Sequence, residues 1–196
     1  MRVIAVWAHI DGNFALILTN CLRTDIATGS AMYQSLTGGD AKRAALAAAA
    51  NQALSPDDFS LFQAVQKAVK ASRDRRNDFA HNIWAFSSDI GNALLLMEAA
   101  VVIDHNVTWR QYIEDHKKPI EVTNGTVRHV LPIPPIFDLD FSKIQVFKKP
   151  DLERDLKAAE EADRLVTLLW MLTRERGGND AARTSLLASP QVAPVF

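Results

Sequence analysis

The stretch RRNDFAHNIW, residues 75 to 84, interrupts an apolar helical pattern with charged and polar side chains. On a helix of 3.6 residues per turn, the apolar residues around it fall within one arc of about 100°, the width of a core-facing stripe. These residues are Phe62, Val65, Val69, Phe79, Ala80 and Ile83. Arg76 and the small Ser72 share that arc. Because a guanidinium is costly to bury without a partner, the position of Arg76 needs an explanation beyond core packing.

Polar and charged residues flank the stripe on one side. They are Lys70, Arg73, Asp74, Asn77 and His81. Asn77 and His81 are four positions apart, so their side chains can touch if the helix continues through residue 81. Between residues 67 and 78 the chain carries five basic residues and two acids, a local charge of +3, whereas the whole chain has a net charge of −1. The sequence therefore predicts a local polyanion site without a global basic field.

Arg76, Asn77 and His81 together fit the chemistry of phosphodiester cleavage. Arginine presents several donors to a phosphate, and histidine exchanges a proton near neutral pH. These three side chains could hold the phosphate, stabilise its developing charge and move the proton of an attacking hydroxyl group. The scheme needs no metal ion and no cofactor, so we predict neither.

The same residues resemble the signature of the HEPN domain family (higher eukaryotes and prokaryotes nucleotide-binding). That signature is an arginine and a histidine separated by four to six residues, the first of which is usually polar. Arg76, Asn77 and His81 match it at the shortest spacing. The stretch is also similar to a bacterial branch of the family that has RN, AHG and W in this order, although Asn82 stands in place of its glycine. The match is close over residues 76 to 84 and loose over the helical layout.

The resemblance implies a metal-independent endoribonuclease in which two copies of the motif meet across a homodimer. His81 would be the general acid/base for a 2′-hydroxyl that attacks the adjacent phosphate, Arg76 would hold the phosphate, and Asn77 would orient the pair. Lys70 and Arg73 would bind the RNA backbone. Many members of the family bind without cleaving, so a non-catalytic nucleotide- or protein-binding module is the alternative. A toxin of this kind would have an antitoxin-like protein partner.

Other interpretations of these residues remain open. Arg76 could pair with an acid on the final helix, where Glu160 and Asp163 are candidates. The basic run could be a solvated helix face, which is the usual meaning of such a run. The spacing alone is not specific, since Arg110 and His116 form a second arginine–histidine pair of the permitted kind.

Composition limits the class of protein. With 196 residues, 48% apolar and 23% charged, the chain is ordinary for a globular domain. Cys21 is the only cysteine, which excludes an internal disulfide and a multi-cysteine zinc site. His9 and Asp11 break the apolar run at the amino terminus too early for an export signal or a membrane span, so we expect a soluble, cytoplasmic protein. The other histidines do not pair at the spacing of a metal site.

Helical patterns predict about five helices. Residues 3–22 repeat apolar side chains at helical spacing, and residues 41–54 are rich in alanine, with Asp40 as the predicted cap. SPDD, residues 55–58, begins a helix that continues past Arg76. The clearest helix begins at PDLERD, has a stripe that includes Leu156 and Val166, and ends at a pair of glycines.

The segment between the motif and the final helix has β-like character. Residues 93–109 predict a β-hairpin with a break at Glu98, or else a helix in their first half. Residues 123–149 combine an Asn-Gly turn pattern with three prolines, which excludes a central strand; their PIPPIF could be the contact surface of an interaction module. We therefore predict a mainly α protein, an antiparallel bundle of about five helices. One domain would span 1–178 with a small β-hairpin-like insertion at 85–149, and 179–196 would be a mobile tail.

Overall fold

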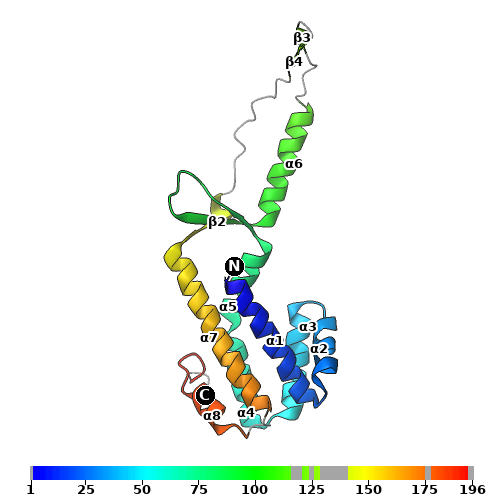
Figure 1. Ribbon diagram of the computed structural model, residues 1–196, viewed down its shortest axis with the longest axis vertical. Helices are drawn as coiled ribbons and strands as arrows, with labels where there is room; N and C mark the ends of the chain where they lie inside the picture. The colour runs from blue at the N-terminus through cyan, green and yellow to red at the C-terminus, as the bar shows by residue number, and fades with distance from the viewer. Residues whose placement is uncertain (1, 116–120, 124–125, 129–140, 175–177, 194–196) are drawn as a thin grey trace. The chain divides into compact units, whose positions relative to one another are not determined.

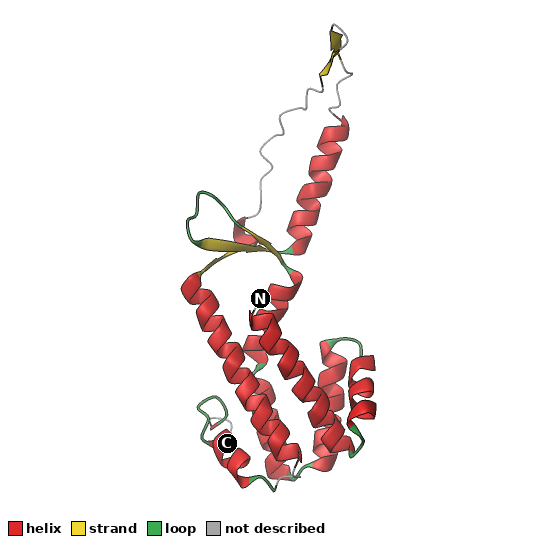
Figure 2. Cartoon of the chain, viewed as in Figure 1, coloured by secondary structure: helices red, strands yellow, loops and turns green. Residues whose placement is uncertain are grey.

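A computed structural model describes residues 2–115, 121–123, 126–128, 141–174 and 178–193. The chain divides into two compact units, one formed by residues 1–78 with 152–196 and the other by residues 79–151. The division falls inside a helix, so the second unit begins six residues before the predicted insertion. The mainly α class with a small β part before the last long helix is confirmed (Figure 2).

In the described residues, the first unit is built from helices, and the strands lie in the second (Figure 1). Its helices are α1 (Arg2–Leu22), α2 (Ile26–Ser35), α3 (Gly39–Ala53), α4 (Pro56–Ala68), α5 (Lys70–His81), α7 (Lys149–Arg174) and α8 (Asp180–Leu187). The described residues thus form more helices than the five predicted. The core is apolar, and Ile10, Ile17, Val166 and Leu169 in α1 and α7 are fully buried.

Helices α1 and α7 lie side by side and run in the same direction (Figure 1). Four polar pairs among the described residues join them: Arg2–Glu160 at 3.3 Å, His9–Asp163 at 2.7 Å, Asn13–Thr167 at 3.1 Å and Asn20–Thr173 at 3.2 Å. The residue numbers rise together in both helices, which defines a parallel pair inside a bundle predicted to be antiparallel. A parallel neighbour is possible because a long segment, rather than a short loop, separates α5 from α7.

Helix α2 approaches α1 closely. A side chain at Gly29 would meet the Thr19 Oγ1 atom at 2.1 Å and its backbone Cα at 2.9 Å, so only glycine fits there. Tyr33 is buried and donates its hydroxyl to Asp11 of α1, and Lys42 of α3 donates to the same carboxylate. These contacts fix the spacing of α1, α2 and α3 around a polar centre.

The helix predicted from SPDD onwards is in fact two helices. Ser55 caps α4 by accepting from the Asp58 amide, and Pro56 occupies the first turn as expected. At Val69 the backbone has a ψ of −5°, far from the helical value of about −42°. This local change interrupts the regular helix, so α4 ends before Val69 and α5 begins after it. Amide hydrogen bonds from Val69 to Val65 and from Arg73 to Val69 continue across the break.

The prediction of a mobile tail from residue 179 is wrong for its described part. Asn179 caps α8 by accepting from the Ala182 amide. Leu186 and Val192 are fully buried. The cap and the buried side chains give the short helix its stability, although eight residues carry little periodicity in the sequence. Asp40 is likewise not the cap of α3, because Gly38 occupies that position.

The second unit contains a three-stranded antiparallel sheet of order β1-β2-β5. Its strands are β1 (Ile83–Ala85), β2 (Ala93–Met97) and β5 (Ile144–Lys148). Phe147 packs against Phe79 and Trp84, with ring centroids 5.3 and 5.7 Å away. The Trp84 indole donates to the Phe79 carbonyl at 3.2 Å, so β1 is fixed to the last turn of α5.

The β-hairpin predicted for residues 93–109 is wrong in its second half, and so is the alternative of a helix in the first half. β2 ends at Met97, and helix α6 (Ala99–Asp115) begins after the expected break at Glu98. Met97 pairs with the first residues of β1 and β5, so the sheet offers no partner further along. β3 (Glu121–Thr123) and β4 (Thr126–Arg128) pair around the predicted Asn-Gly turn, which itself lies outside the described residues, as does PIPPIF.

Helix α1 continues through His9 and Asp11 to Leu22. By length and composition this helix is long and apolar enough to cross a membrane. The expectation that His9 and Asp11 break the apolar run too early for a membrane span therefore does not hold by these two criteria. Half of this stretch is buried within the protein, and core helices of globular proteins pass the same test. Its buried polar groups have partners: Asn13 bonds Thr167, and Thr19 bonds the Ala15 carbonyl.

Candidate functional site

The three motif residues lie on the last turns of α5. The helix continues to His81, as the motif requires, whereas Ile83 belongs to β1. The predicted stripe is buried at Phe62, Val65, Val69 and Phe79 and exposed at Ala80 and Ile83. The stripe therefore ends one turn earlier than the helical pattern suggested.

Arg76 is half-buried, and its guanidinium is held by an amide rather than by a carboxylate. Its Nη1 donates to the Oδ1 of Asn77 at 3.0 Å. Its Nε is buried and has no hydrogen-bond partner among the described residues. The remaining terminal N–H groups of the guanidinium are the donors that an anion could use.

The alternative ion pair of Arg76 with the final helix is not formed. Glu160 instead accepts from Arg2 at 3.3 Å, and Asp163 lies 2.7 Å from His9. The neighbouring Arg75 contacts α7, with its Nε 3.5 Å from Asp155. The predicted alternative is therefore wrong, because the ion pair to α7 joins a different arginine to a different acid.

Asn77 and His81 are exposed. Their spacing on one helix allows their side chains to meet. Because the Asn77 Oδ1 accepts from Arg76, its amide nitrogen remains as the donor. His81 is the last residue of α5.

The two residues predicted to bind the RNA backbone differ in their surroundings. Lys70 forms an ion pair with Asp74 at 2.5 Å, and this contact lowers the pKa of the carboxyl group. Arg73 is half-buried, and its Nε has no hydrogen-bond partner in the described part of the chain. Burial, followed by the nearby charge of Arg43, lowers the pKa of the Arg73 guanidinium. Arg73 is thus the more available of the two cations.

Arg43 on α3 is the residue that the sequence analysis missed. It is close enough to Arg73 to act on its pKa, and it forms an ion pair with the largely exposed Asp40. Thirty positions separate the two arginines, so only the packing of α3 near α5 brings them together. Arg76 follows Arg73 by three positions on α5, so Arg43, Arg73 and Arg76 concentrate positive charge on the helical unit.

The histidine and acid patterns elsewhere give no competing site. Among the described residues, no three histidine, cysteine, aspartate or glutamate side chains gather as a group that could hold a metal ion. His116 of the second arginine–histidine pair lies outside the described residues.

Comparisons with protein-family models, with curated proteins and with solved structures found no match to this chain.

Proposed function

We propose that this protein is a HEPN-like, metal-independent endoribonuclease that acts on RNA as a homodimer through Arg76, Asn77 and His81. The observation that carries the proposal is the state of Arg76. It lies half-buried in a core-facing stripe, yet its one hydrogen bond among the described residues goes to a neutral amide. Desolvating a guanidinium in this way has a cost, and an anionic substrate would offset it.

The roles follow from the chemistry of the side chains. His81 takes the proton of a ribose 2′-hydroxyl, whose oxygen attacks the adjacent phosphorus. Arg76 binds the non-bridging oxygens and stabilises the charge that develops on them. The bond to the 5′-oxygen breaks, and a protonated imidazole returns a proton to that oxygen. The products are a 2′,3′-cyclic phosphate and a 5′-hydroxyl end. Asn77 orients the guanidinium through its 3.0 Å hydrogen bond.

A second copy of the chain belongs to this mechanism. Residues five positions apart on a helix are rotated by about 140°, so Arg76 and His81 do not share one face of α5. A twofold dimer in which two α5 helices meet would place the arginine of one copy beside the histidine of the other. It would also supply both the base and the acid of the reaction.

The RNA backbone would extend from this centre over Arg73 and Arg43. Both cations lie on the helical unit, and the Arg73 Nε is buried without a partner among the described residues. Lys70 contributes less, because its partner Asp74 is only half-exposed. Asp40, the partner of Arg43, is 94% exposed and can be exchanged more easily for a phosphate. Binding should weaken with salt as phosphates displace counterions.

The test is cleavage of a mixed-sequence RNA in the presence of EDTA by the wild type and by His81→Ala and Arg76→Ala. We expect the arginine variant to lose roughly 10²–10³-fold and the histidine variant roughly 10²–10⁴-fold in rate. The matched controls are Arg75→Ala, the ion-paired neighbour, and His9→Ala, a histidine on α1. Both controls should cleave like the wild type.

Each step has an outcome that would contradict it. A wild-type protein that binds RNA but leaves it intact would overturn the enzymatic part and favour the non-catalytic binding module. If sedimentation experiments show a monomer under conditions in which the protein cleaves RNA at its full rate, the site is not shared between two copies. Cleavage that survives both motif substitutions would place the chemistry elsewhere.

A further inference from the structure

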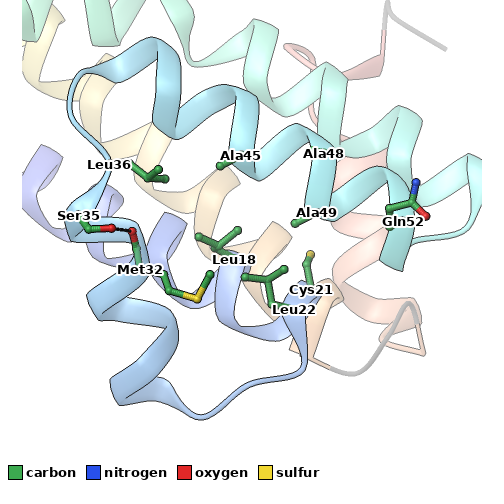
Figure 3. A pocket seen from close by; sticks show the side chains of 10 residues that line it. All are labelled: Leu18, Cys21, Leu22, Met32, Ser35, Leu36, Ala45, Ala48, Ala49 and Gln52. Carbon is green, nitrogen blue, oxygen red and sulfur yellow. Dashed lines mark hydrogen bonds between the residues drawn. The ribbon is translucent and has the colours of Figure 1, made fainter.

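Helices α1, α2 and α3 line an apolar hollow of about 460 Å³ that is open to solvent on one side (Figure 3). It belongs to the helical unit and shares no residue with the α5 site. Its walls include Leu18, Leu22, Met32, Leu36, Ala45 and Ala49. Figure 3 shows these side chains facing a common space from three helices.

The hollow exists because α3 presents alanines where larger side chains would fill the space. The alanine-rich run of α3 contributes Ala45, Ala48 and Ala49 to the wall. The three helices cannot move together to fill this space, because other contacts between them set their spacing. The contact of Gly29 with Thr19 sets the approach of α2 to α1, and Asp11 joins α1 to Tyr33 of α2 and Lys42 of α3. The space is therefore preformed, as in most ligand pockets.

The chemistry of the wall is uncharged. None of the residues that line it is ionised at neutral pH, since burial raises the pKa of the Cys21 thiol to about 11. The Ser35 hydroxyl donates to the Met32 carbonyl at 2.7 Å and is already engaged. A phosphate or carboxylate would find no counter-charge inside, whereas an aliphatic chain would find apolar contacts on three sides.

We propose that this hollow binds the aliphatic chain of an uncharged small molecule. Its volume lies within the range of about 300–1,000 Å³ that ligand sites usually have. Leu22 and Met32 lie where the hollow meets the solvent, and their side chains are 41% and 47% exposed. Methionine is flexible and adapts its shape to apolar guests, so it can close over a chain of variable length. The polar end of such a ligand, the hydroxyl group in an alcohol, would remain in the solvent.

Cys21 provides a direct readout, because it lines the hollow and is the only cysteine of the chain. The test measures the rate at which an aromatic disulfide reagent labels Cys21 in the full-length protein, with and without 1-decanol. We expect saturable protection of the thiol by 1-decanol. 1-Octanol should require a higher concentration, since each methylene group changes affinity roughly fourfold. The labelling rate should also rise about tenfold per pH unit below the thiol pKa, since the thiolate is the reactive form.

Variants separate this hollow from unspecific binding. Ala45→Phe places a large side chain in the wall and should abolish protection, whereas Ala44→Phe is the matched control, because residue 44 is exposed and does not line the hollow. Ala48→Phe at the exposed part of the wall is the second filled variant, should the first fail to fold. Circular dichroism checks the fold of each.

Three outcomes would overturn the proposal. One is the absence of protection up to the solubility limit of 1-decanol. Another is equal protection in the filled variants and in the control. A third is a wild-type dimer that Ala45→Phe dissociates, which would make the hollow a contact between copies of the chain. None of these outcomes depends on RNA cleavage.

Discussion

Arg183 and Arg76 are both partly buried arginines of the helical unit, but their partners differ. Arg183 of α8 binds the carboxylate of Asp58 through three hydrogen bonds of 2.9 to 3.1 Å. Arg76 has one hydrogen bond among the described residues, to the neutral Asn77. The two arginines therefore differ in their surroundings. A bidentate pair with a buried acid stabilises the fold, and a guanidinium without such an acid is available to an anion.

The largest effect is expected when the structural pair is broken. Asp58 is 2% exposed, caps α4 together with Ser55 and holds Arg183 in place. Asp58→Ala should lower the free energy of unfolding by about 3 kcal/mol, because it removes the buried acid of Arg183, whereas Asp180, a further ion-pair partner, is exposed. Arg76→Ala should change it by less than about 1 kcal/mol. Urea unfolding followed by circular dichroism measures both. An equal loss in the two variants would erase the distinction between the arginines.

A second prediction converts one arginine into the other kind. Asn77→Asp replaces the amide by a carboxylate of the same shape, 3.0 Å from the guanidinium. We expect a gain in stability below about 1 kcal/mol and a loss of RNA affinity of roughly tenfold, because the new acid competes with the phosphate. Fluorescence anisotropy with a labelled RNA measures the affinity. Gln63→Glu on the exposed side of α4 adds the same charge elsewhere and serves as the control. Unchanged affinity in Asn77→Asp would argue against Arg76 as the phosphate ligand.

The smallest effect is expected at Arg75. Its ion pairs to Asp78 and Asp155 are 3.6 and 3.5 Å long, and its side chain is 35% exposed. Arg75→Ala should cost about 0.5 kcal/mol, less at high salt, and leave RNA cleavage unchanged. If its cleavage rate fell as far as that of Arg76→Ala, the basic run as a whole, and not one arginine, would be the functional element.

The helices with local signals could be predicted from the sequence. Pro56 and its acids begin α4, and the apolar stripe of α7 ends near its closing basic residue, Arg174. Residues that depend on distant partners could not. Leu186 and Arg183 stabilise α8 through contacts with the rest of the unit, the second of them across 125 positions. The β-branched residues after Glu98 predict a strand, but this segment forms helix α6. β-branched residues favour a strand only where a neighbouring strand is available to pair with.

The candidate site shows the same division. Helical periodicity placed Arg76 in the stripe and the histidine beyond it, and the helix does continue to His81. The partner of each arginine was a tertiary question: Arg75 contacts Asp155, and Arg43 comes near Arg73, because of how whole helices pack.

The sequence by itself determined the helical class of this protein, the long final helix and the arginine–histidine motif, since these depend on spacing along one segment. Tertiary structure alone decided the folded tail, the parallel pairing of α1 with α7, the arginine pair on α3 and α5, and the apolar hollow. Each of these depends on side chains that are far apart in the chain, and no local pattern encodes which of them meet.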